Sequence, residues 1–196
     1  MERIAVIDFE TTGIQPSSSC RATEIAVVIL EQGQIVDRYQ SLMNAGVRVP
    51  GFIEQLTGIS NAMLRTAPSA ERVMNEVNEF VGTTPLLAHN AAFDQKFWDF
   101  ELGLIRRTRL QKFACSLLLA RRLMPAAPNH KLGTLTSFAH CPTPARLTGR
   151  WRMRRWRRTL PRIWPRNCAA PTGCGSCPTN CCAACRRFRR RRSMII

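Results

Sequence analysis

Two acidic residues, Asp8 and Glu10, lie two positions apart at the end of a short apolar run that starts after Arg3. Successive side chains of a β-strand point to opposite faces, so residues two apart share one face of a sheet. Neighbouring carboxylates repel each other unless a positive charge lies between them, and hard divalent cations prefer oxygen ligands. The pair therefore indicates either a metal site or the solvated end of a strand.

A third acidic residue, Asp94, follows the apolar run over residues 85–88. It falls in the first turn of a helix expected over residues 91–104. The helix dipole stabilises a carboxylate at that position, so Asp94 by itself requires no metal. If the strand over residues 85–88 lies beside the strand that carries Asp8 and Glu10, however, the three carboxylates can share one metal site, and we favour this interpretation.

The elements that must position these carboxylates alternate between strands and helices. Apolar runs bounded by turn residues predict strands, and apolar residues every three or four positions predict helices. Three strands precede the helices, an order that favours an α/β domain built on a mixed sheet. Strands are expected over residues 3–9, 24–30, 34–43, 85–88 and 113–115, and helices within 50–64 (broken at Gly58) and over 69–81, 91–104 and 116–123.

Charge is distributed unevenly along the 196 residues, whose formal net charge is +16. All 13 acidic residues lie at or before Glu101, whereas residues 102–196 hold 22 basic residues and no acidic one. Since about one residue in eight is acidic in an ordinary domain, a single uniform globular domain is excluded. We expect a folded domain over residues 1–140 and a basic, Cys-rich, disordered tail over residues 141–196.

The sequence lacks the segments that mark membrane and secreted proteins. It has no apolar run of about 18 residues, the length that spans a membrane, and its first residues do not form a secretory signal. We therefore expect a cytoplasmic protein without a membrane partner. Its nine cysteines are expected to be thiols rather than disulfides.

Together, the acidic clusters resemble the first two motifs of the DEDD-type 3′–5′ exonucleases, and most closely those of the DnaQ-like, epsilon-type proofreading exonucleases. The two matching segments are Asp8-Phe9-Glu10-Thr11-Thr12-Gly13 and His89-Asn90 with Phe93-Asp94. Further matches follow in the expected order at Leu56-Thr57-Gly58-Ile59, Cys115-Ser116 with Ala120-Arg121, and Asn129-His130-Lys131-Leu132. The resemblance covers about residues 3–139.

The resemblance implies a ribonuclease-H-like fold, in which helices flank a mixed sheet, and hydrolysis of phosphodiester bonds at DNA 3′ ends with two Mg²⁺ or Mn²⁺ ions. It implies that the metal ligands and catalytic residues are Asp8, Glu10 and Asp94. It also implies that the substrate is contacted by Thr11, Thr12, Gly13, Asn90 and Phe93. RNA as the substrate and association with a DNA polymerase stay open, and His89 and His130 receive no catalytic role.

The family's site also requires a fourth carboxylate and a general base. The carboxylate is an Asp on a late helix, and the base is a His five residues before it or a Tyr four residues before it. The chain holds no Asp or Glu after Glu101 and no His after His140. The sequence as written therefore lacks both groups.

A shifted reading frame accounts for this loss. Residues 147–156, written with one permitted set of codons and read from the third base, yield His-Arg-Ala-Leu-Ala-Asp-Ala-Glu-Met, with His and Asp at the family's spacing. The same shift permits a helical stripe of leucines in place of Cys174, Cys177, Cys181 and Cys185. We therefore predict a frameshift between about residues 135 and 147.

The alternative takes the tail as a functional sequence. Its two Cys-x-x-Cys pairs, within residues 174–177 and 182–185, are separated by only four residues, which is short for a zinc site. The arginine-rich run over residues 186–192 is suited to phosphates. On this hypothesis the chain is a catalytically inactive nucleic-acid-binding protein that acts through its basic tail. A module that keeps the fold for protein interaction alone is a third hypothesis.

Overall fold

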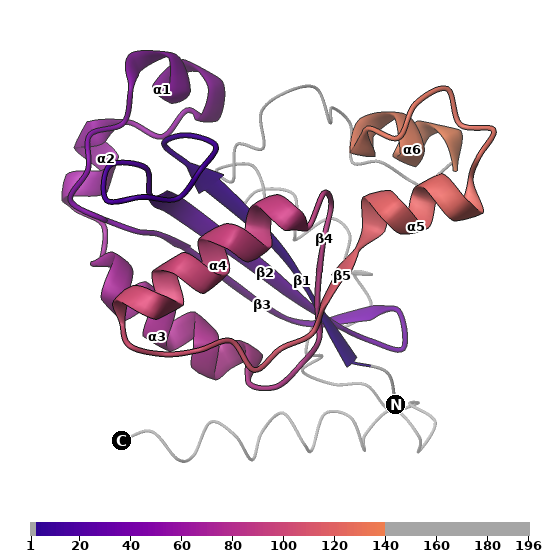
Figure 1. Cartoon of the computed structure of the whole chain (residues 1–196), viewed down its shortest axis with the longest axis horizontal. Helices are drawn as coiled ribbons and strands as arrows, with labels where there is room; N and C mark the ends of the chain where they lie inside the picture. The colour runs from indigo at the N-terminus through magenta and orange to yellow at the C-terminus, as the bar shows by residue number, and fades with distance from the viewer. Residues whose placement is uncertain (1–2, 140–196) are drawn as a thin grey trace, which may run out of the picture. The chain divides into compact units, whose positions relative to one another are not determined.

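The computed structural model describes residues 3–139. The tail predicted over residues 141–196 lies outside the described residues, and the frameshift predicted between about residues 135 and 147 is not tested by them. Five strands form one mixed sheet in the order β3-β2-β1-β4-β5 (Figure 1). Their bounds are β1 (Arg3–Thr11), β2 (Ala22–Glu31), β3 (Gln34–Leu42), β4 (Leu86–Ala88) and β5 (Phe113–Cys115). Strands β1, β2 and β3 form an antiparallel meander. Strand β4 pairs in parallel with β1, and β5 pairs in parallel with β4. The predicted mixed α/β sheet is confirmed.

Three helices connect β3 to β4, one connects β4 to β5, and two follow β5. Their bounds are α1 (Gly51–Thr57), α2 (Asn61–Arg65), α3 (Ala70–Val81), α4 (Ala92–Leu104), α5 (Ser116–Leu123) and α6 (Leu132–Phe138). The expected helices are present within a residue or two, and Gly58 ends α1 with a left-handed φ of 76°. Helix α6 was not predicted, because its sequence contains glycine and threonine and buries only Leu135. Within residues 3–139, no helix is long and apolar enough to cross a membrane.

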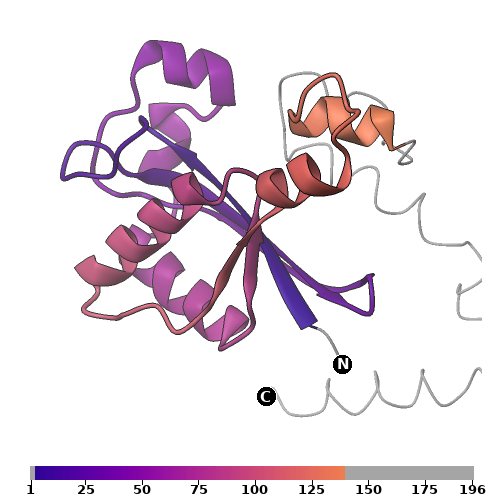
Figure 2. The ribbon, with the colours of Figure 1, turned by 45° about the vertical axis from the view of Figure 1, so that its right-hand side comes forward.

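One face of the sheet carries the main hydrophobic core. The odd-numbered residues Ala5, Ile7 and Phe9 of β1 are at most 4% exposed, and their neighbours on β2 are buried on the same side. Helices α3 and α4 lie side by side on this face (Figures 1 and 2). The Phe9 ring meets those of Phe97 and Trp98 from α4 at centroid distances of 6.5 and 6.4 Å. This packing fixes α4, and therefore its first turn, against β1.

The opposite face of the same two strands is less completely buried. Ile4 and Val6 of β1 and Val28 and Leu30 of β2 point to this face and are only partly buried. Asp8 and Glu10 belong to the same set of alternating residues. The carboxylates of β1 therefore lie on the more open face.

Candidate active site

Strand β1 places Asp8 and Glu10 on one face of the sheet, as their spacing predicted. Asp8 is exposed and Glu10 is partly buried. Across the antiparallel pair, Asp8 lies opposite Ala26 and Glu10 lies opposite Glu24. The end of β1 thus presents two accessible carboxylates beside a third acidic residue from β2.

Asp94 reaches this end of β1 from helix α4. Strand β4 pairs in parallel with β1, so the chain that leaves β4 enters α4 at the carboxyl end of β1. Asp94 is 3% exposed, and its Oδ1 accepts a hydrogen bond from the backbone N–H of Phe9 at 3.2 Å. Phe9 lies between Asp8 and Glu10. This contact brings the two acidic clusters of the sequence together.

The carboxyl groups at this sheet end have raised pKa values. The surrounding protein limits hydration of the Asp8 carboxylate and raises its pKa to about 6, although the residue as a whole is exposed. Burial and the charge of Asp8 raise the pKa of Glu10 to about 7. Burial and the same charge raise the pKa of Asp94 to about 7, against the lowering effect of the Phe9 N–H. The site is therefore a cluster of mutually repelling acids.

Glu24 is an acidic member of this cluster that sequence reasoning did not select. It is 7% exposed, and Gln40 of β3 donates a hydrogen bond from Nε2 to its Oε1 at 3.1 Å. Burial raises the pKa of Glu24 to about 7, with further contributions from Glu10 and Asp8. Only the register of β1 with β2 reveals this neighbour, because a long connection separates the two strands in sequence.

The donor chemistry of the cluster fits a hard divalent cation. Carboxylate oxygens are suitable ligands, and a cation would offset the burial and the mutual repulsion that raise their pKa values. Within residues 3–139, however, no group of three or more His, Cys, Asp or Glu side chains is arranged closely enough to hold a metal ion. The described side chains supply ligands of the right type without forming a closed metal cage.

The residues that follow Glu10 form a tight loop with internal hydrogen bonds. Thr11 Oγ1 donates to the Gly13 carbonyl at 2.6 Å, and Thr12 Oγ1 accepts from the Arg21 backbone N–H at 3.0 Å. Both threonines are 7% exposed. A Cβ at Gly13 would lie 2.9 Å from Cys20 Sγ, so glycine permits this close approach. The threonine hydroxyl groups serve the loop itself.

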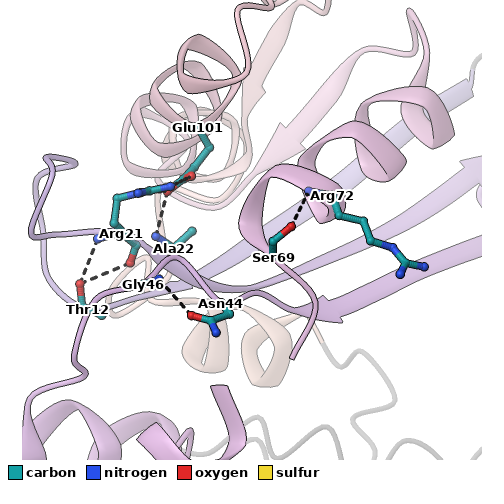
Figure 3. Close-up of polar contacts among 8 residues, drawn as sticks. All are labelled: Thr12, Arg21, Ala22, Asn44, Gly46, Ser69, Arg72 and Glu101. Atoms are coloured by element: carbon teal, nitrogen blue, oxygen red, sulfur yellow. Dashed lines mark hydrogen bonds and ion pairs between the residues drawn. The ribbon is translucent and has the colours of Figure 1, made fainter. Parts of the chain in front are cut away.

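A buried ion pair holds this loop against helix α4 (Figure 3). Arg21 donates from Nε and Nη2 to the two oxygens of Glu101 at 2.9 and 2.8 Å. Glu101 is 1% exposed and also accepts from the Ala22 backbone N–H at 3.2 Å. Because α4 also carries Asp94, the pair fixes the loop relative to the acidic cluster. Sequence spacing gave no sign of this contact, which joins residues 80 positions apart.

The remaining predicted site residues lie in and after the turn between β4 and α4. Asn90 is exposed with a left-handed φ of 67°, a conformation that asparagine tolerates. Phe93 is partly buried, and its ring packs 5.1 Å from that of Phe97. His89 Nδ1 lies 3.0 Å from Ser116 Oγ, and His89 Nε2 lies 3.0 Å from the carbonyl oxygen of His130. His89 therefore connects the turn to the segment that precedes α6.

Comparison with known proteins identifies the family and the fold. The model of the exonuclease family (RNase_T) matches residues 5–140. The chain is 37% identical over 139 residues to the 3′-5′ exonuclease DinG of Bacillus subtilis, covering 69% of this chain and 15% of that protein. It is 35% identical over 131 residues to the DNA polymerase III subunit epsilon of Aquifex aeolicus, covering 65% of this chain and 63% of that protein.

Solved structures show the same fold at lower sequence identity. Exonuclease X in complex with 5′ overhanging duplex DNA has a TM-score of 0.60 and 24% identity, covering 75% of this chain and 81% of that chain. Exonuclease I of E. coli in complex with a dA16 oligonucleotide has a TM-score of 0.57 and 15% identity, covering 66% of this chain and 32% of that chain. The expected ribonuclease-H-like fold is confirmed.

Proposed function

Because this chain belongs to the exonuclease family, we propose that it derives from a metal-dependent 3′–5′ exonuclease that removes nucleotides from the 3′ end of DNA. We further propose that the written chain is catalytically impaired, because it lacks a fourth carboxylate and a general base. Similarity to the Aquifex epsilon subunit supports a proofreading role with a DNA polymerase.

The hydrogen bond between Asp94 and the Phe9 N–H carries this proposal. This bond, 3.2 Å long, joins Asp94 of α4 to β1 at Phe9, the residue between Asp8 and Glu10. A buried carboxylate used only to stabilise its own helix would need no such contact with a neighbouring strand. The contact supports a shared cation site at the end of β1, for which the described side chains supply ligands of the right type.

The chain's own residues would prepare the reaction as follows. Asp8, Glu10 and Asp94 would hold Mg²⁺ or Mn²⁺ and orient the phosphodiester group. When bound, the ions would lower the pKa of water and stabilise negative charge on the phosphate. The loop from Thr11 to Gly13 would contact the terminal nucleotide through its backbone, since its threonine hydroxyl groups are engaged within the loop.

Within the described residues, His89 does not fit the role of general base. Both ring nitrogens of His89 have hydrogen-bond partners, and Nε2 of His130 lies 3.2 Å from the Met124 carbonyl oxygen. A base that accepts a proton from water needs a free nitrogen within reach of that water. His89 therefore does not replace the missing general base.

An assay on two chains tests the proposal. We compare the chain with the sequence given (the written chain) and a chain translated in the shifted frame from about residue 140 (the restored chain). Both are assayed on a 3′-ended single strand with Mn²⁺ and equal amounts of folded protein. Loss of one stabilising contact costs about 10²–10³ in rate, and loss of a base costs about 10²–10⁴. The written chain should therefore be at least about 10⁴-fold slower.

Two controls interpret the result. EDTA should abolish activity of the restored chain, and a strand blocked at its 3′ end should resist it. Equal rates for the two chains would show that the fourth carboxylate is dispensable. If neither chain cleaves but the written chain binds nucleic acid through residues 141–196, the alternative of an inactive binding protein replaces the proposal.

A further inference from the structure

An open, positively charged pocket borders the turn between β4 and α4. It has a volume of about 550 Å³ and is lined by residues from the turn after β4, from α5 and from the segment that leads into α6. Its polar lining residues are His89, Asn90, Arg121, Asn129, His130 and Lys131. The family motif was matched at several of these positions, yet the catalytic proposal gives none of them except Asn90 a role.

Hydrogen bonds hold the wall of the pocket in place. His89 contacts Ser116 on α5 and the His130 carbonyl through its two ring nitrogens. The ring of His130 lies 3.2 Å from the Met124 carbonyl oxygen, at the end of α5. These contacts join three segments distant in sequence, so the cavity has a defined shape before any ligand binds.

The cations of the pocket are available to a ligand. Arg121 and Lys131 are exposed, and within residues 3–139 neither side chain has a hydrogen-bond or ion-pair partner. None of the residues that line the pocket is acidic. Two unpaired cations, with neutral amides beside them, form a site for an anion with several oxygen acceptors.

We propose that this pocket binds a phosphodiester group of the substrate strand, away from the bond that is cleaved. The inference rests on the proposed function, because it assigns the pocket to a nucleic-acid strand. Asn90 connects the two sites: it lines the pocket and belongs to the turn that leads into α4 and Asp94. A strand whose 3′ end lies at the acidic cluster would therefore gain a second anchoring point at Arg121 and Lys131.

Strand binding without hydrolysis tests the pocket. Fluorescence anisotropy with labelled dT10 in EDTA, over a series of salt concentrations, compares the full chain with Arg121→Ala/Lys131→Ala. Each lost phosphate contact lowers the salt slope of single-strand binding by about 0.7. The double variant should thus lower the slope by about 1.4 and the affinity by about 10- to 30-fold at 0.1 M salt.

A matched control removes equal charge elsewhere. Arg106 and Arg122 are exposed, do not line the pocket and have no side-chain partner among residues 3–139. Arg106→Ala/Arg122→Ala should therefore change affinity less than about threefold and leave the slope intact. The arginines of residues 141–196 contribute equally to all of these chains. Arg121→Lys, which keeps the charge, should retain most of the binding.

Two outcomes would overturn the proposal. One is an equal loss of affinity in the pocket and control variants, which would mean that only total charge matters. The other is a loss of affinity for free dTMP without a loss for dT10, which would make the pocket a mononucleotide site. A pocket-specific loss, together with no cleavage by the chain with the restored frame, would support the pocket and contradict only the proposed activity.

Discussion

The two faces of the β1-β2 hairpin differ in how completely they are buried and in what they carry. Helices α3 and α4 cover one face, where residues such as Ile7 and Val27 are at most 2% exposed. On the other face, Val6 and Val28 are only partly buried, and Asp8 is exposed. The same strands therefore provide stability on one side and accessible carboxylates on the other. The separation allows a repulsive acidic cluster to exist without interrupting the core.

The largest effect is expected on the acidic face. In the chain with the restored frame, Asp8→Ala removes a proposed metal ligand, and activity should fall by about 10³-fold or more. His130→Ala should cost less than about tenfold, because its ring contacts a backbone carbonyl in the α5-α6 connection. Single-turnover rates on a 3′-ended strand measure both effects. Similar losses in the two variants would contradict the assignment of Asp8 as a metal ligand.

The next largest effect concerns the ion pair that joins the loop after β1 to helix α4. Arg21→Ala leaves the charge of Glu101 buried without its partner and should lower the free energy of unfolding by about 3–5 kcal/mol. Arg21→Met/Glu101→Gln removes both charges and should recover much of that loss. Urea denaturation compares the variants. A double variant no more stable than Arg21→Ala would show that the pair acts through specific hydrogen bonds instead.

A direct comparison of the two faces uses consecutive residues of β2. Val27 is 1% exposed on the core face, whereas Val28 is partly buried on the open face. Val27→Ala should cost about 2–3 kcal/mol, because it leaves a cavity under α3 and α4, and Val28→Ala should cost about 1 kcal/mol. Equal losses in denaturation experiments would mean that the open face is packed as tightly as the core.

A smaller and gradual effect is expected from pH. Burial raises the pKa values of Glu10 and Asp94 to about 7, so the folded protein keeps protons between about pH 4 and 7 that the unfolded chain releases. The stability of the metal-free protein should therefore fall as pH rises through this range and level off above it. Solvent at the exposed Asp8 moderates the effect.

Thermal unfolding in EDTA at pH 5 and pH 8 measures this dependence. Asp94→Asn removes one of the acids and should make the melting temperature less dependent on pH. Mn²⁺ should restore stability at pH 8, because the cation binds the ionised carboxylates of the folded state. A metal-free protein that is more stable at pH 8 than at pH 5 would contradict the repulsive cluster.

The sequence by itself determined the elements and the chemical types of the site. Alternation in β1 placed Asp8 and Glu10 on one face, and the apolar spacing of α3 marked that helix. Such patterns depend on residues only a few positions apart, so they can be read from the chain alone. The absence of Asp and Glu after Glu101 was evident from composition in the same way.

Only the tertiary structure decided which distant residues meet. The approach of Asp94 to the Phe9 N–H follows from the parallel pairing of β4 with β1, and Glu24 joins the cluster through the register of a hairpin with a long connection. The pairing of Arg21 with Glu101 depends on how α4 packs over the core face. Register and helix packing are set by the burial of many side chains together, so no single motif contains them.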